Sequence, residues 1–238
     1  KSIEREGQDR FSLELPVDQQ EFIKELYKVN PNTVVVLVAG SSMAVNWMDE
    51  NVPAILNAWY PGEQGGNAVA EVLFGDYNPG GRLPLTYYNS LDEIPAFDNY
   101  FVKGRTYQYF EGQPLYEFGY GLSYTKFRYK SKGVNVEQDT VKVSFEVSNT
   151  GKYDGDEVAQ VYVKYPETGT YMPLKQLHGF KRVHIKKGKT SKVTIGVPKK
   201  DLRYWDEQER KFVTPKGEYT FMVGASSDDI KFRETVGL

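Results

Sequence analysis

The 238-residue sequence has no cysteine, only two histidines, almost no net charge and no long apolar run. The absence of cysteine excludes disulfide bonds and thiol catalysis. A net charge of −2, from 30 basic and 32 acidic residues, provides no electrostatic signature of nucleic-acid binding. No apolar stretch approaches the ~20 residues that a membrane-spanning helix needs. Together these absences favour a soluble globular protein with neither nucleic acid nor a membrane as its partner.

The two histidines, His178 and His184, flank the sequence GFKRV in a stretch that alternates like a strand. Neither a two-histidine metal site nor a Ser–His triad is expected from this arrangement. The chain begins with Lys1 rather than with Met, which suggests a fragment or the second piece of a cleaved chain. Its start therefore carries no information about targeting.

The first third of the sequence has the pattern of an α/β fold. Residues 17–28 have apolar side chains at helical spacing, and a second helix is expected over 67–74. Two apolar runs, 33–39 and 54–59, are typical of strands buried on both faces, with a short helix around 44–48 between them. Strand, crossover and strand predict a parallel sheet with flanking helices. Two strands form only part of such a sheet, so further strands must come from elsewhere.

The last hundred residues alternate apolar and polar side chains with a period of two, whereas residues 76–127 are dense in turn signals and predict little regular structure. Short alternating strands separated by turn residues predict an antiparallel β-sandwich. The expected strands are 141–149, 157–165, 177–185, 191–197 and 217–226. The alternation directs six apolar side chains into the core: Phe145, Val147, Val161, Val163, Phe221 and Val223.

Two blocks rich in Gly, Pro and aromatics carry a family resemblance. Residues 59–88 read WYPGEQGGNAVAEVLFGDYNPGGRLPLTYY, and residues 116–127 read YEFGYGLSYTKF. They resemble the C-terminal half of glycoside hydrolase family 3, the retaining β-glucosidases and β-xylosidases. The resemblance implies the C-terminal part of an α/β sandwich over 1–88, an aromatic-rich linker over 89–130, and a fibronectin-III-like β-sandwich over 131–238.

The resemblance also suggests a catalytic residue near the start of the chain. The stretch SIEREGQDR (2–10) resembles the E-x-E-G-x-D-R segment that many family members place before an L-P-x-x-Q helix, here LPVDQ at 15–19. It implies that Glu6 is the general acid/base, with Glu4 as second choice for that role. From the residues alone, a solvated charge cluster near a chain end is the favoured reading, because neighbouring arginines keep a carboxylate ionised whereas an acid catalyst needs a raised pKa.

Several other residues could contact a sugar or build the fold, and structure is the favoured reading for each. Glu63, in the loop after the second predicted strand, is not expected to be catalytic. Trp205 is expected in the core, and the FGYGLSY stretch is expected to pack between domains. The remaining candidates are arginines and aromatics of the turn-rich segment: Arg82, Arg105, Tyr107, Tyr109 and Phe110.

By resemblance, the chain is part of a retaining exo-acting β-glycosidase, most simply a β-glucosidase, that removes terminal non-reducing β-linked sugars from oligosaccharides. The Asp nucleophile would lie on an N-terminal barrel, on another chain or upstream, and this fragment would be inactive alone. Two carboxyls suffice for the reaction, so no cofactor or metal is expected. The alternatives are a noncatalytic carbohydrate-binding or interaction module, a β-xylosidase and a glycoside phosphorylase. The resemblance favours a periplasmic or extracellular location and leaves a homodimer open.

Overall fold

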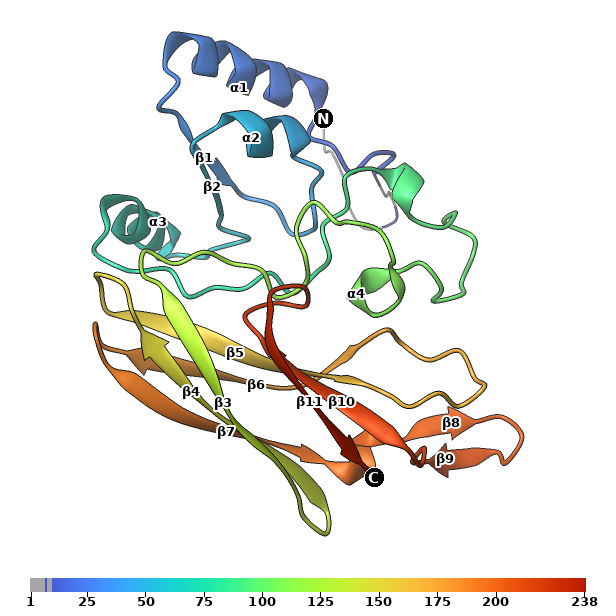
Figure 1. Cartoon of the computed structure of the whole chain (residues 1–238). Coiled ribbons are helices and arrows are strands. Elements are labelled where there is room, and N and C mark those ends of the chain that lie inside the picture. The colour runs from blue at the N-terminus through green and yellow to red at the C-terminus, as the bar shows by residue number, and fades with distance from the viewer. Residues whose placement is uncertain (1–6, 8–9) are drawn as a thin grey trace. The chain divides into compact units, whose positions relative to one another are not determined.

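A computed structural model describes residue 7 and residues 10–238 of the chain (Figure 1). The residues form two compact units. The first comprises the residues through Tyr77 together with Leu85–Arg105 and Glu111–Tyr116, and the second comprises Asn78–Pro84, Thr106–Phe110 and Glu117–Leu238. The chain therefore passes from one unit to the other five times before it remains in the second.

The first unit contains the α/β elements that the sequence predicts. They are α1 (Val17–Val29), β1 (Val34–Leu37), α2 (Asn46–Asn51), β2 (Ala54–Asn57), α3 (Gly65–Phe74) and a 3-10 turn, η1 (Leu91–Glu93). β1 and β2 pair in parallel, with Val34 opposite Ala54, so the predicted parallel pairing is confirmed. The expectation that both strands are buried on both faces is wrong for the described residues, since Val34 is 44% exposed and β2 has no buried residue. α3 ends at Gly75, whose φ of +84° is the left-handed conformation that glycine adopts most readily.

The core of this unit is small and lies around β1 and α2. Val35, Leu37, Val45, Met48 and Val52 are at most 9% exposed. α1 has no fully buried residue and contributes Ile23 and Tyr27 at the margin of the core. Among the described residues the sheet has two strands, so both of its outer edges are unpaired there.

The second unit is a β-sandwich with one short helix, α4 (Thr106–Tyr109). One sheet has the order β11-β10-β5-β6 and the other the order β3-β4-β7, as Figure 1 shows. The strands are β3 (Phe127–Val136), β4 (Thr140–Asn149), β5 (Gly155–Lys164), β6 (Gln176–Ile185), β7 (Thr190–Pro198), β8 (Tyr204–Asp206), β9 (Lys211–Val213), β10 (Glu218–Gly224) and β11 (Ile230–Gly237), with a 3-10 turn, η2 (Lys199–Leu202), before β8.

The sandwich core follows the predicted alternation. All six side chains that were expected inside are at most 1% exposed. Burial of such side chains is worth roughly 1.5–3 kcal/mol each, so this alternating set is the main source of stability in the unit. No helix in the described part of the chain has both the length and the apolar character to cross a membrane.

The sequence did not predict β3 or β11, and both lie at the edge of their sheets. Each alternates intermediate and exposed residues and contains charged side chains, because one long side of an edge strand faces water. β3 also carries an irregular register between Ser131 and Val134 around Gly133, whose φ is +98°. Charge and a bulge remove the apolar alternation by which the inner strands are recognised.

Acid should weaken the sandwich through His178 of β6. Its Nε2 lies 2.9 Å from the hydroxyl oxygen of Tyr165. Burial lowers the pKa of His178 below its ordinary 6.5, and the Asp201 carboxylate opposes this only in part. The unfolded chain therefore takes up the proton at a higher pH than the folded chain, so stability that is complete above about pH 6.5 falls as the pH drops below it. Denaturant unfolding at pH 7 and pH 5 should show a smaller acid loss in His178→Gln, and an equal loss would contradict the assignment.

Candidate functional site

The carboxyl ends of β1 and β2 form the most site-like edge of the first unit, since ligands of open α/β sheets bind beyond these ends. After β2, Trp59 adopts φ +51°, which is uncommon for a residue other than glycine. The next residue, Tyr60, is 73% exposed. Its ring lies against Gly40 of the loop after β1, where an added Cβ would come within 2.5 Å of the ring carbon Cε2. A glycine at position 40 thus permits an aromatic ring at this edge.

The residues that follow the predicted acid/base segment are tied to the same edge. Arg10 Nη2 donates to the Ser42 carbonyl oxygen at 2.9 Å. Ala44 N donates to the Leu13 carbonyl oxygen at 2.8 Å, and Glu14 forms a parallel bridge with Ala44. The chain from Arg10 to Glu14 therefore runs beside the loop that leaves β1. Glu4 and Glu6 lie outside the described residues, so their assignment remains a prediction.

A third segment reaches this edge through Tyr87, which is 3% exposed. Asn57, the last residue of β2, donates from Nδ2 to the Tyr87 hydroxyl at 2.7 Å. Burial raises the pKa of Tyr87, and the Asn57 hydrogen bond opposes this only in part. Tyr87 also exchanges two backbone hydrogen bonds with Tyr116. Glu63 is exposed in the loop that leads to α3, and no described contact supports a catalytic role for it.

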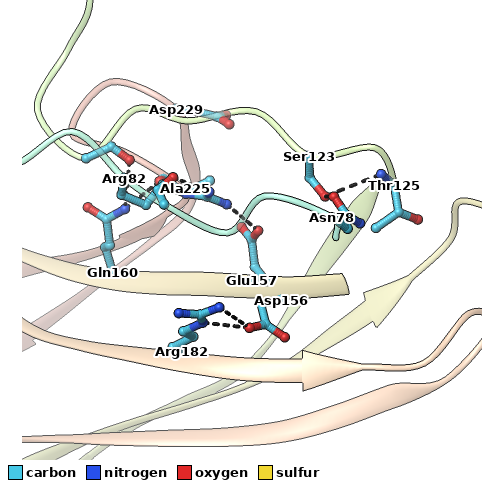
Figure 2. A network of polar contacts seen from close by, with 12 residues as sticks. Asn78, Arg82, Ser123, Thr125, Asp156, Glu157, Gln160, Arg182, Ala225 and Asp229 are labelled. Atoms are coloured by element: carbon cyan, nitrogen blue, oxygen red, sulfur yellow. Dashed lines mark hydrogen bonds and ion pairs between the residues drawn. The ribbon is translucent and has the colours of Figure 1, made fainter. Parts of the chain in front are cut away.

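Arg82 has a structural role, as expected, and the pair it forms is buried. Its Nη2 lies 2.8 Å from Glu157 Oε2, and the two side chains are only 9% and 3% exposed (Figure 2). The Tyr129 hydroxyl donates to the other Glu157 oxygen at 2.6 Å. Burial first, and then the Glu157 charge, raise the pKa of Tyr129. The Glu157 carboxylate is thus bonded on both oxygens inside the sandwich unit.

Residues 78–84 and 117–125, here called the strap, attach to the sandwich through further polar contacts. Asn78 Oδ1 accepts from the Ser123 hydroxyl at 3.0 Å and from the Tyr124 backbone at 2.8 Å, as Figure 2 shows for Ser123. Gln160 Nε2 donates to the Gly119 carbonyl oxygen at 3.1 Å. Gly119 has φ +83°, and a Cβ there would overlap the Gln160 amide. The strap therefore covers the outer face of β5, which explains why the alternation of β5 ends in a run of buried residues.

The other arginine and aromatic candidates also build structure. Arg105 Nη2 donates to the carbonyl oxygens of Pro95, Ala96 and Asn99 at 3.3, 2.9 and 2.7 Å, which confirms that it fixes the long loop. Tyr107 stacks on Phe118 with ring centroids 4.2 Å apart, and its hydroxyl accepts from the Leu177 backbone. Tyr109 likewise stacks on Tyr171 with ring centroids 5.4 Å apart. Both tyrosines thus pack against other rings of the fold.

The expectation that Trp205 lies in the core is wrong. Trp205 is 50% exposed and its neighbour Phe212 is 61% exposed. The two rings meet edge to face at 73° on the β8–β9 hairpin. The hairpin has three residues per strand, which is too short for the tryptophan to reach the core between the two large sheets.

The two histidines lie on β6 and have separate partners. His178 contacts Tyr165, whereas His184 Nδ1 lies 2.7 Å from Asp156 Oδ1. Burial acts to raise the pKa of Asp156, but hydrogen bonds from His184 and Arg182 outweigh it and hold that pKa below its ordinary value. In the described part of the chain no group of three or more His, Asp or Glu side chains could hold a metal ion.

The buried pair was missed by sequence reasoning although part of its signal was present. Glu157 occupies the same alternating register as Ala159, Val161 and Val163, which are all buried. A carboxylate at an inward position requires a partner. That partner, Arg82, lies 75 residues away and no local pattern connects the two.

Comparison with known proteins agrees with this arrangement. Residues 1–124 match the glycosyl hydrolase family 3 C-terminal domain, and residues 157–227 match the fibronectin type III-like domain. A xylan 1,4-β-xylosidase of Xylanibacter ruminicola is 42% identical over 94% of this chain and 26% of its own length. A β-glucosidase of Bacteroides ovatus is 34% identical over 95% of this chain and 33% of its own length.

Solved structures give the same result. The crystal structure of a β-glucosidase from Kluyveromyces marxianus superposes with a TM-score of 0.91 at 37% identity, over 99% of this chain and 30% of that one. The chain thus spans between about a quarter and a third of the length of these relatives. Since more than half of the sequence matches the domain of one family, this chain belongs to glycoside hydrolase family 3.

Proposed function

We propose that this chain is the C-terminal part of a retaining exo-acting β-glycosidase, in which Glu6 is the general acid/base and an N-terminal barrel supplies the Asp nucleophile. The substrate is a β-linked oligosaccharide or glycoside, cleaved at its terminal non-reducing sugar, and glucose is the favoured sugar. The relatives named β-glucosidase and β-xylosidase support the glycosidase class. Their greater length supports a further domain elsewhere in the complete enzyme.

The observation that carries the assignment of this chain's role is the attachment of Arg10–Glu14 to the loop after β1. Arg10 bonds the Ser42 carbonyl oxygen, and Leu13 accepts from Ala44. Glu6 precedes Arg10 by four residues, which span at most about 14 Å of chain. This reach supports the proposal that Glu6 serves a substrate bound beyond the carboxyl edge of the sheet.

The proposed reaction needs two carboxyls about 5–5.5 Å apart. The Asp of the barrel attacks the anomeric carbon while Glu6 gives its proton to the glycosidic oxygen, which leaves with the second sugar. Glu6, now a carboxylate, takes a proton from water, and the water oxygen replaces Asp at the anomeric carbon. Glu6 ends protonated again, so no cofactor is consumed. Gly7, directly after Glu6, has φ +73°, a turn that a residue with a side chain would adopt only under strain.

Xylose is the second candidate sugar, because the xylan 1,4-β-xylosidase of Xylanibacter ruminicola is 42% identical to this chain. Hydrolysis of aryl β-glucoside and aryl β-xyloside by the complete enzyme decides between the two sugars. The alternative from another functional class is a noncatalytic carbohydrate-binding or interaction module. It has less support, since Trp205 and Phe212 meet at 73° and so provide no flat platform for a sugar ring.

The stereochemistry of the product tests the proposal. Proton NMR of the complete enzyme acting on an aryl β-glycoside should show the β-anomer first, with the α-anomer appearing only by slow mutarotation, because two successive inversions restore the configuration. First appearance of the α-anomer would overturn the retaining mechanism. A sugar phosphate formed in phosphate buffer would identify a phosphorylase, and absence of turnover by the complete protein would favour the binding module.

A further inference from the structure

The loop Pro95–Arg105 of the first unit, here called the aromatic loop, presents three large rings to the outside. Phe97, Tyr100 and Phe101 are 82%, 90% and 79% exposed, and Val102 between them and the loop end is 52% exposed. The loop forms part of the green segment before α4 in Figure 1. Soluble proteins rarely expose apolar side chains in such a group unless the group binds something.

The aromatic loop is held in one conformation by its own polar groups. Beyond its three carbonyl bonds from Nη2, Arg105 donates its backbone N–H to the Val102 carbonyl oxygen at 3.0 Å. Asn99 donates to the Ala96 carbonyl oxygen at 2.9 Å and accepts from the Phe101 backbone through Oδ1 at 3.1 Å. Gly104 has φ +75°, which closes the turn before Arg105. The rings are therefore presented by a braced loop, and binding them costs little further ordering.

The chemistry of the aromatic loop favours a protein surface over a sugar. Two of the three rings are phenylalanines and have no hydroxyl. The Arg105 guanidinium and the Asn99 amide oxygen, which could hold sugar hydroxyls, bond to the loop backbone. Aromatic anchors on a rigid element are typical of the centres of protein interfaces.

We propose that the aromatic loop docks onto the N-terminal barrel domain of the complete enzyme. This inference rests on the proposed function for the existence of that domain. Its support is the length of the relatives, of which this chain covers 26% to 33% in the curated proteins and 30% in the superposed crystal structure. A polypeptide three to four times longer has to cover part of the surface that is exposed here, and the aromatic loop presents three large rings within five residues of that surface.

This chain contains no cysteine, and thiol reaction of the parent complete enzyme is subtracted as the background of the test. Phe97→Cys, Tyr100→Cys and Phe101→Cys are each made in the complete enzyme, and the rate of thiol modification is measured on the native protein and in denaturant. Tyr153→Cys is the matched control, since Tyr153 is a 60% exposed aromatic of the sandwich unit. Docking predicts that the three loop thiols react about tenfold or more slowly than the control in the native enzyme and equally fast in denaturant.

Other results identify other occupants of the loop. Loop thiols that react as fast as the control overturn the proposal, and protection only in the presence of glycoside identifies a substrate surface instead. Protection that disappears on dilution to the monomer identifies a second copy. The readout needs no turnover, so the docking can fail while the enzyme is an active retaining glycosidase, and it can hold in an enzyme that proves inactive.

Discussion

Glu6→Gln in the complete enzyme should reduce hydrolysis of glycosides with poor leaving groups by about 10²–10⁴-fold, the usual contribution of general acid catalysis. Aryl glycosides with acidic phenols should lose much less in the glycosylation step, because their leaving oxygen needs no proton. Added azide should restore turnover of these activated substrates, since a small anion can attack the glycosyl-enzyme without base assistance. The measurements are kcat/KM against leaving-group pKa for the acid role, and kcat on activated substrates with and without azide for the base role.

Glu4→Gln is the matched control, two residues away and of the same charge. Its kcat/KM should stay near that of the parent across the leaving-group series. If Glu4→Gln has the steep leaving-group dependence and Glu6→Gln does not, the acid/base is Glu4. If neither variant loses activity, the assignment of this segment is wrong, although the family membership of the chain is unaffected.

Arg82→Met should destabilise the sandwich unit by about 3–5 kcal/mol, because it leaves the Glu157 carboxylate buried without its counter-charge. Denaturant unfolding followed by the near-ultraviolet signal of the sandwich should report it. Combined replacement in Arg82→Met/Glu157→Leu should recover part of the loss, since no charge is then buried. A double variant less stable than Arg82→Met would mean that the cost lies in packing and not in charge.

β5 supplies the control for this prediction. Asp156 and Glu157 are adjacent, so their side chains point to opposite faces of the strand. Asp156 pairs with Arg182, whose side chain is 52% exposed, whereas Arg82 is 9% exposed. Arg182→Met should therefore cost no more than about 1 kcal/mol. Similar losses in the two variants would contradict the importance of burial for the Arg82 pair.

Local patterns in the sequence were sufficient to predict the helices and strands whose apolar residues recur with a regular spacing. The apolar run of β1 and the strict alternation of β4 carry their own signal, and Gly75 ends α3 where expected. The edge strands β3 and β11 were missed because charged residues interrupt their alternation. Trp205 was wrongly expected in the core because it lies on a three-residue strand of a separate hairpin. The attachment of the strap was not predicted for a different reason. It depends on the ion pair of Arg82 with Glu157, which lie 75 residues apart in the sequence.

For the candidate site, the sequence predicted only the features that lie within one continuous motif, and not the contacts between separate loops. The order of segments around Glu6 and the run of glycines after β2 are sequence features, but the ring of Tyr60 on Gly40 joins residues of two loops. That contact depends on the parallel pairing of β1 and β2, which brings both carboxyl ends to one edge. The attachment of Arg10 to Ser42 likewise follows from tertiary structure and from no spacing along the chain.

Because the chain passes five times between its two units, exchange of the sandwich by protein engineering or by gene recombination is restricted. A fibronectin-III-like domain that merely followed the α/β unit could be removed or exchanged with one cut. Here Asn78–Pro84, Thr106–Phe110 and the start of Glu117–Leu238 belong to the sandwich but are separated by segments of the other unit. No single crossover in a gene can transfer the sandwich and its strap without also transferring Leu85–Arg105 and Glu111–Tyr116 of the first unit. A chimaera that keeps both units from one parent should therefore fold, whereas one joined at the start of β3 combines the strap of one parent with the β5 of another.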